Sequence, residues 1–169
     1  TRHVALMMGY YKEPEMTAQV ITSDGFLKTG DQGRLDEDGF LIITGRVKDL
    51  FKTDKGKYIS PSPIEMKLQK NSDIEQVCVV GMGIPQPIAL VNISASGKAK
   101  SKEELIRSLA ASVEEVNPTV EHYEHIKKVV IMKEEWSINN GLMTPTMKVK
   151  RNEVEKLKVP HYPEWYAKE

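Results

Sequence analysis

The sequence predicts an α+β fold, in which a small sheet with helices packed on it follows a segment that is mostly β-structure. Three observations favour this class. Residues 1–47 are apolar stretches separated by glycines, several later apolar runs are typical of buried strands, and an amphipathic helical pattern near residue 110 separates two of those runs. We therefore expect the architecture to change near residue 48.

The composition is that of a globular protein with a core of its own. The 169 residues are 28% charged and 40% apolar, and 24 basic side chains balance 24 acidic ones. This balance argues against a nucleic-acid binder held by net charge. The sequence has no apolar run long enough to span a bilayer and no segment like a signal peptide, so membrane association is expected to be peripheral at most. Cys78 is the single cysteine, which excludes internal disulfides and favours a reduced, cytoplasmic setting.

Residues 1–47 are expected to form β-hairpins. Asp24-Gly25 and Asp38-Gly39 each lie between apolar stretches, the pattern of a tight turn. Residues 40–44 are predicted to form the strand that leaves the second turn. The chain opens on Thr1-Arg2-His3 and runs straight into apolar residues, so we expect a piece of a longer protein.

Mixed helices and strands are predicted from residue 48 onward. Ser62 is expected to cap a short helix, with Pro63 in its first turn and Glu65 completing a capping box. Residues 76–80 and 88–94 are predicted to be strands because they are short apolar runs bounded by polar or turn residues.

The clearest helix begins at Ser101, where a second capping box precedes a regular apolar pattern. Its spacing predicts a buried stripe formed by Ile106, Leu109, Ala110, Val113 and Val116. Asn117-Pro118 should end this helix. A strand over 126–132 and a short final helix over 152–157 complete the predicted fold.

Generic nucleotide and metal motifs are absent from the sequence. Gly81-Met82-Gly83 lacks the third glycine of a dinucleotide loop, and Gly56-Lys57 lacks the other residues of a phosphate loop. His122 and His125 lie three residues apart, but a metal site needs more ligands, and a solvated helical turn accounts for the pair. No metal site is therefore predicted.

Three polar segments, in this order, carry a family resemblance. They are GFLKTGD at 25–31, GRVKDLFK at 45–52 with its continuation to Glu65, and GLMTPTMKVKR at 141–151. The chain resembles the adenylate-forming enzymes, which include acyl-CoA synthetases, peptide-synthetase adenylation domains and luciferases. The second and third segments are most similar to those of bacterial long-chain fatty acid–CoA ligases.

The resemblance implies a reaction and a domain organisation. Such ligases make an acyl-adenylate from a fatty acid and ATP with Mg²⁺, release pyrophosphate, and then transfer the acyl group to coenzyme A, releasing AMP. Residues 1–47 are then expected to be the C-terminal end of the large AMP-binding domain, and residues 48–169 the small C-terminal lid domain, which rotates between the two half-reactions. The partner of the chain would be its own large N-terminal domain, and the isolated chain is expected to be inactive.

The resemblance also assigns residues to the nucleotide and to the hinge. Asp31 matches the ribose-binding aspartate, whose carboxylate accepts strong hydrogen bonds from hydroxyls. Arg46 matches an arginine that contacts the nucleotide, where a planar guanidinium suits oxygen ligands. Lys48 matches the hinge of the lid. Taken alone, the three residues would be interpreted as a turn aspartate, a surface salt bridge and a sheet-edge lysine.

Two lysines match residues that enter the active site in different lid orientations. Lys148 matches the lysine that bridges the substrate carboxylate and the α-phosphate during adenylation, where a fixed positive charge favours the transition state. Lys52 matches a lysine that turns toward the active site in the second orientation. A solvated strand lysine remains an alternative interpretation of Lys52.

The sequence departs from the family pattern at two places. Gly56, Lys57 and Tyr58 are the candidates for the pantetheine path of coenzyme A, but relatives often have adjacent glycines where this chain has Lys55-Gly56. Many relatives also have glycine immediately before the adenylation lysine, where this chain has Met147. Two alternatives to a CoA ligase stay open: an adenylation enzyme that loads a carrier-protein thiol, and a non-catalytic interaction module with the lid fold.

Overall fold

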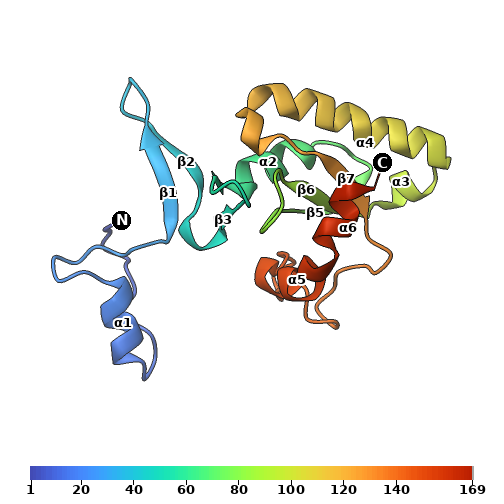
Figure 1. Cartoon of the computed structure of the whole chain (residues 1–169). Coiled ribbons are helices and arrows are strands. Elements are labelled where there is room, and N and C mark those ends of the chain that lie inside the picture. The colour runs from blue at the N-terminus through green and yellow to red at the C-terminus, as the bar shows by residue number, and fades with distance from the viewer. Residues whose placement is uncertain (169) are drawn as a thin grey trace. The chain divides into compact units, whose positions relative to one another are not determined.

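The computed structural model describes residues 1–168, which have the mixed α and β architecture predicted from the sequence. They form two compact units, the first over Thr1–Lys48 (blue to cyan in Figure 1) and the second beginning at Asp49. The units therefore divide one residue after the expected change of architecture between residues 47 and 48.

The first unit contains a helix and a two-stranded ribbon. Helix α1 spans Pro14–Val20, and strands β1 (Asp31–Leu35) and β2 (Leu41–Arg46) pair antiparallel across the Asp38-Gly39 turn. Gly39 has a φ of 85°, a left-handed conformation that costs glycine little. An isolated antiparallel bridge flanks the Asp24-Gly25 turn, so both predicted turns are confirmed.

Helix α1 corrects the prediction that residues 1–47 are β-structure throughout. Pro14 occupies its first turn and Glu15 follows, and both residues favour a helix start. The β-prediction rested on glycine spacing, but no glycine lies between Gly9 and Gly25. The helical signals in that interval therefore decide the local structure.

The second unit is built on a three-stranded sheet with strand order β5-β6-β7. Strand β5 (Ile74–Val80) pairs antiparallel with β6 (Ile88–Ile93), and β6 pairs parallel with β7 (Lys128–Ile131). All three predicted strands are thus present, each within two residues of its expected limits. A separate hairpin joins β3 (Phe51–Lys52) to β4 (Tyr58–Ile59).

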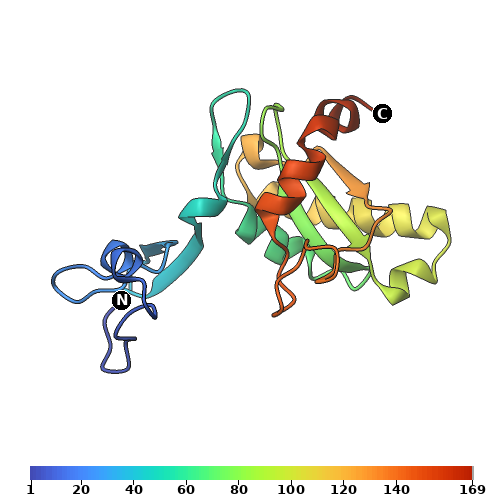
Figure 2. The ribbon, with the colours of Figure 1, turned by 90° about the horizontal axis from the view of Figure 1, so that it is seen from below.

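Side chains of β5 alternate between two cores. Val77 and Val79 belong to a cluster with α2 (Pro61–Leu68) and α4 (Lys102–Val116), whereas Cys78 belongs to a cluster with α5 (Arg151–Lys158) and α6 (Tyr162–Ala167). Figures 1 and 2 show the first pair of helices on one face of the sheet and the second pair on the other. Because both faces are covered there, the strand is apolar and buried from Val77 to Val80.

Helix α4 confirms its predicted cap but corrects its stripe. Ser101 Oγ accepts a hydrogen bond from the Glu104 amide at 3.3 Å, and the Glu104 carboxylate accepts one from the Ser101 amide at 2.9 Å. Leu109 and Val116 are buried as predicted, but Ile106 is 51% exposed and Ala110 is also exposed. Leu105 packs on the core in place of Ile106, because the buried face lies one residue to the side of the expected one.

Two further helix predictions need correction. Helix α2 begins at Pro61 after Ser60, and the expected box between Ser62 and Glu65 is wrong because the Glu65 carboxylate bonds elsewhere. Helix α5 is present where a final helix is predicted, but α6 follows it, with Pro163 in its first turn. The remaining elements among the described residues are the short helix α3 (Ala95–Lys98) and four single 3₁₀ turns, at 47–49, 117–119, 122–124 and 159–161.

Candidate functional site

The two predicted nucleotide residues lie together in the first unit. Asp31 and Arg46 are direct partners in the β1–β2 register, and their side chains form an ion pair of 3.1 Å between Oδ1 and Nε. Arg46 also donates from Nη2 to the Thr29 carbonyl oxygen at 3.3 Å. The Asp31 side chain is 37% exposed and the Arg46 side chain 59% exposed, so both retain open polar atoms that a ligand can reach.

The predicted hinge residue is the last residue of the first unit. Lys48 lies in the 3₁₀ turn Val47–Asp49 and is exposed. The turn separates β2 from β3, and the amide of Val47 donates to the Gly30 carbonyl oxygen at 2.9 Å. The backbone before Lys48 is thus tied to the ribbon, and the chain passes to the second unit after it.

The β3–β4 hairpin carries the predicted second lysine and the predicted coenzyme A residues. Lys52 and Tyr58 are partners in the register, and the Lys52 ammonium lies 5.6 Å from the centre of the Tyr58 ring. Gly56 has a φ of 78° in the turn between them, a conformation that favours glycine. The Lys57 ammonium lies 5.4 Å from the centre of the Tyr123 ring.

Lys148 lies near the tip of a hairpin over residues 143–149, which we call the arm. Met143 and Val149 form an isolated antiparallel bridge at its base. Within the arm, the Thr144 amide donates to the Lys148 carbonyl oxygen at 2.8 Å, and the Lys148 amide donates to Thr144 Oγ1 at 3.1 Å. The Lys148 side chain is exposed, and among residues 1–168 its ammonium has no hydrogen-bond or ion-pair partner.

Met147, which stands where many relatives have glycine before the adenylation lysine, has a backbone conformation that favours glycine. It has a φ of 61°, which places a non-glycine residue in the left-handed region. The turn before Lys148 therefore has the backbone conformation that glycine adopts without penalty, and this chain adopts it with a methionine.

A buried ion pair below the arm was missed by sequence reasoning. Arg151, the first residue of α5, donates from Nη2 to the Glu65 carboxylate of α2 and from Nη1 to the Val79 carbonyl oxygen at 2.5 Å. Glu65 Oε1 also accepts a hydrogen bond from the Val79 amide at 2.7 Å. The side chains are 11% exposed for Arg151 and 16% for Glu65. The only available signal was that both residues lie within the matched polar segments.

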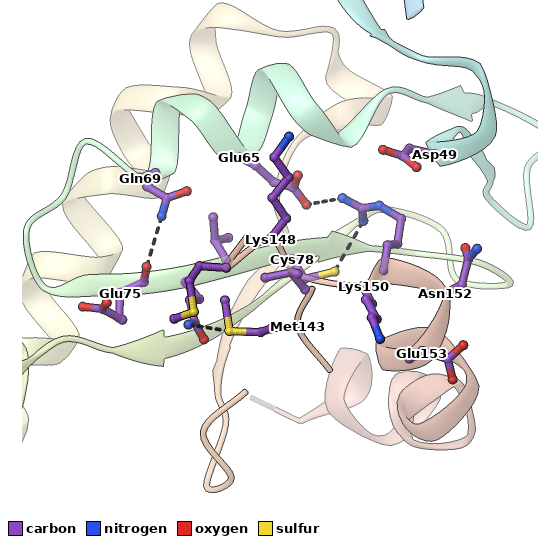
Figure 3. A pocket seen from close by; sticks show the side chains of 15 residues that line it. Asp49, Glu65, Gln69, Glu75, Cys78, Met143, Lys148, Lys150, Asn152 and Glu153 are labelled. Atoms are coloured by element: carbon purple, nitrogen blue, oxygen red, sulfur yellow. Dashed lines mark hydrogen bonds and ion pairs between the residues drawn. The ribbon is translucent and has the colours of Figure 1, made fainter. Parts of the chain in front are cut away.

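The arm and the ion pair line a pocket of about 640 Å³ in the second unit (Figure 3). Basic and acidic side chains line it together, so its charge is mixed. The charged and amide residues are Asp49, Glu65, Gln69, Glu75, Gln76, Lys148, Lys150, Arg151, Asn152 and Glu153. None of the predicted residues of the β3–β4 hairpin is among the residues that line it.

Cys78 also lines this pocket, but it is a buried core residue rather than a nucleophile. Burial raises the pKa of its thiol to about 12, so the thiol stays neutral near pH 7. Within residues 1–168, no three histidine, cysteine or carboxylate side chains converge as a metal site requires. No helix among these residues is long and apolar enough to cross a membrane.

The fold and the sequence of the second unit define its family. The model of the AMP-binding enzyme C-terminal domain matches residues 48–159, which is more than half of the chain. The chain therefore belongs to this family of adenylate-forming enzymes, as the three polar segments predicted.

Individual relatives point in the same direction. The chain is 36% identical over 163 residues to the long-chain-fatty-acid–CoA ligase FadD15 of Mycobacterium tuberculosis, which covers 86% of this chain and 27% of that protein. It is 36% identical over 166 residues to long-chain-fatty-acid–CoA ligase 5 of Rattus norvegicus, covering 88% of this chain and 24% of that protein. The chain thus spans about a quarter of the length of these relatives.

A solved structure shares the fold. It is the A domain of carboxylic acid reductase from Segniliparus rugosus, in complex with AMP and a co-purified carboxylic acid. The TM-score is 0.75 at 25% identity, over 96% of this chain and 26% of that one. The similar structures therefore include an adenylating enzyme of a different overall reaction.

Proposed function

We propose that this chain is the C-terminal portion of a long-chain fatty acid–CoA ligase, an acid–thiol ligase. Residues 1–47 would close the large AMP-binding domain and residues 48–169 would form its lid. The observation that carries the proposal is Lys148, which has a free ammonium near the tip of a hairpin in a chain of this family. Support for the fatty acid as substrate comes from the two ligases, each 36% identical to the chain.

In the first half-reaction, an oxygen of the fatty acid carboxylate would attack the α-phosphorus of ATP. A new P–O bond forms as the bond to the pyrophosphate oxygen breaks, and negative charge grows on the α-phosphate oxygens. The Lys148 ammonium would lie between these oxygens and the carboxylate. Removal of one preorganised oxyanion donor typically costs about 2.7–4 kcal/mol, or 10²–10³ in rate, and we expect a similar contribution from this ammonium.

The nucleotide itself would be held in part by the first unit. Asp31 would accept hydrogen bonds from the ribose hydroxyls, and Arg46, already paired with it, would keep that carboxylate oriented. Mg²⁺ bound with ATP would neutralise part of the phosphate charge, and residues 1–168 contain no cluster of three or more histidine, cysteine or carboxylate side chains that could hold it.

In the second half-reaction, the thiol of coenzyme A would attack the acyl carbonyl carbon. The C–S bond forms, the C–O bond to AMP breaks, and the thiol proton is released. Lys52 would replace Lys148 at the active site after the lid turns about Lys48. Gly56, Lys57 and Tyr58, on the same hairpin as Lys52, would border the pantetheine path.

The test uses the full-length protein that contains this chain, with ATP–pyrophosphate exchange for adenylation and thioester formation from supplied acyl-adenylate for the second step. Lys148→Ala should lower the first rate about 100-fold or more and leave the second nearly unchanged. Lys150→Ala, at the neighbouring exposed lysine, is the matched control and should leave both rates near wild type. Equal loss in both steps would contradict the assignment of Lys148.

The acceptor is tested in the same protein. A second solved structure of the same reductase contains its A-PCP didomain in complex with AMP. This relative keeps a carrier-protein thiol as the second candidate acceptor. Thioester formation with coenzyme A but not with a carrier protein supports the ligase. The reverse result supports a carrier-loading enzyme, and no ATP turnover by a folded full-length protein would support a non-catalytic module.

A further inference from the structure

The arm is fastened to the sheet at both of its ends, and only its tip is free. Strand β5, to which it is fastened, is an edge strand, because the sheet order is β5-β6-β7. On one side of the arm, Gln76 Nε2 of β5 lies 3.0 Å from Met143 Sδ. On the other side, Arg151 bonds to Val79 of the same strand. The tip residues Pro145, Thr146, Met147 and Lys148 are exposed.

The bonds at Val79 are unusual for an edge strand. Edge strands commonly leave their outer amide and carbonyl groups to water. Here the Val79 amide donates to Glu65, and its carbonyl oxygen accepts from Arg151. The Glu65–Arg151 ion pair therefore acts as a clasp that joins α2, β5 and the start of α5 at a single backbone position.

The clasp is strong, and it fails if either of its two side chains is removed. Its hydrogen bonds all involve an ionised group, and such bonds are roughly twice as strong as neutral ones. Both side chains are largely buried, so removal of one partner leaves the other charge poorly solvated and unpaired. Loss of Glu65 therefore removes one of the two strong bonds that hold Arg151, the other being its bond to the Val79 carbonyl oxygen.

The clasp also lies close to the proposed catalytic group along the chain. Arg151 follows Lys148 by three residues, which span at most about 11 Å when extended. The Lys150 amide donates to the Leu142 carbonyl oxygen at 2.8 Å, so the intervening backbone is itself held across the base of the arm. Because Arg151 and the Lys150 amide are adjacent anchors of the same backbone, a displacement of Arg151 should loosen the base of the arm and change the position of Lys148.

We propose that Glu65 and Arg151 are positioning residues for Lys148, since their clasp on Val79 fixes the base from which the arm extends. The inference rests on the proposed function of Lys148 in adenylation. Neither residue touches the reacting atoms, so their removal should misplace the ammonium without changing what the nucleotide contacts.

The activity test compares the variants Glu65→Gln and Arg151→Lys in the full-length protein. Adenylation kcat should fall about 10- to 100-fold, which is the usual effect of a misplacement near 1 Å, while the KM for ATP changes by less than about 3-fold. Thioester formation from supplied acyl-adenylate should stay near wild type. Glu164→Gln, at the exposed Glu164–Lys168 pair of α6, is the matched control and should affect neither step.

Amide hydrogen exchange on the same proteins gives a readout independent of catalysis. In Glu65→Gln the amides of Thr144 and Met147, which form the hydrogen bonds of the arm, should exchange faster, and the Leu90 amide in β6 should be unchanged. If Arg151→Lys unfolds the domain, Glu65→Gln still tests the proposal, because glutamine keeps the shape of the glutamate side chain.

Two results would overturn the inference and one would instead overturn the proposed function. Unchanged arm exchange in Glu65→Gln, or an equal fall in both half-reactions, would show that the clasp does not position Lys148. If Lys148→Ala leaves adenylation intact, the proposed function fails by itself, and the exchange data still report whether the clasp holds the arm.

Discussion

The carboxylate of Asp31 lies 3.1 Å from the Nε atom of Arg46, directly across the β1–β2 ribbon. Exposed ion pairs of this kind contribute only about 0–1 kcal/mol to folding. The pair is therefore poorly explained as a stabilising contact, and we expect substitutions there to affect ligand binding more than stability.

Asp31→Asn in the full-length protein should raise the KM for ATP. Hydrogen bonds to a charged group are worth about 1.5–3 kcal/mol, so an increase of roughly 10- to 100-fold is expected. Steady-state kinetics at varied ATP provide the measurement, and Glu37→Gln in the exposed β1–β2 turn is the control. An unchanged KM together with a lower melting temperature would assign Asp31 a structural role.

Lys48→Pro should separate the two half-reactions in the opposite sense to Lys148→Ala. Proline fixes φ near −65°, so rotation at the junction of the units would be restricted. Thioester formation should fall about 10-fold or more while adenylation is retained, as expected when a gating motion is blocked. Lys48→Ala removes the side chain but leaves φ free, and it should behave as wild type if the backbone is what matters.

Met147→Gly should stabilise the chain. A non-glycine residue in the left-handed region costs roughly 1–2 kcal/mol, and glycine there costs roughly 0.5–1 kcal/mol of extra entropy in the unfolded chain. The difference predicts a gain of about 0.5–1 kcal/mol, measured by urea unfolding. Met147→Val, which is β-branched, should instead destabilise, and equal stability of the two variants would mean that the turn is not strained.

Asp73 should make stability depend on pH in the acid range. Its side chain is 1% exposed, and hydrogen bonds from Lys100 Nζ and Ser108 Oγ, both at 2.5 Å, lower the pKa of this carboxyl below its ordinary 3.8. The unfolded state therefore takes up a proton before the folded state does. The stabilisation is present above the unfolded pKa and is lost as the pH falls through the folded pKa.

The experiment for Asp73 is urea unfolding between about pH 6 and pH 2. Asp73→Asn should lower the free energy of unfolding at pH 6 and flatten its decline with acid relative to wild type. Parallel curves for the two proteins would show that Asp73 does not titrate differently in the folded state.

The sequence predicted the second unit well because its elements carry strong local signals. The apolar runs of β5 and β6, and the capping box at Ser101, each determine structure within a few residues. The predicted buried stripe of α4 was wrong at Ile106 because Leu105 and Ile106 are both apolar. Only tertiary packing decides which of them faces the core. Helix α1 was missed because the prediction for residues 1–47 rested on glycine spacing, and this short helix buries no residue that would give it a strong apolar pattern.

The candidate site was less predictable. Lys148 and Asp31 were found through matched segments, but their assigned roles remain predictions. The Glu65–Arg151 clasp joins residues 86 positions apart, and Glu65 has a local alternative as a helix-capping residue. Such long-range partners leave no trace in spacing or periodicity, so the three-dimensional arrangement was needed to identify them.

The β1–β2 ribbon carries large apolar side chains that are exposed among residues 1–168. Leu35 and Phe40 are 68% exposed, and Leu41 and Ile43 are 65% and 57% exposed. A ribbon of this kind is expected to self-associate in water, because exposed apolar patches promote association between molecules. Recombinant material that starts at Asp49 should consequently remain dispersed at higher concentrations than the 169-residue polypeptide, which makes it the better choice for crystallisation or isotope-labelled spectroscopy.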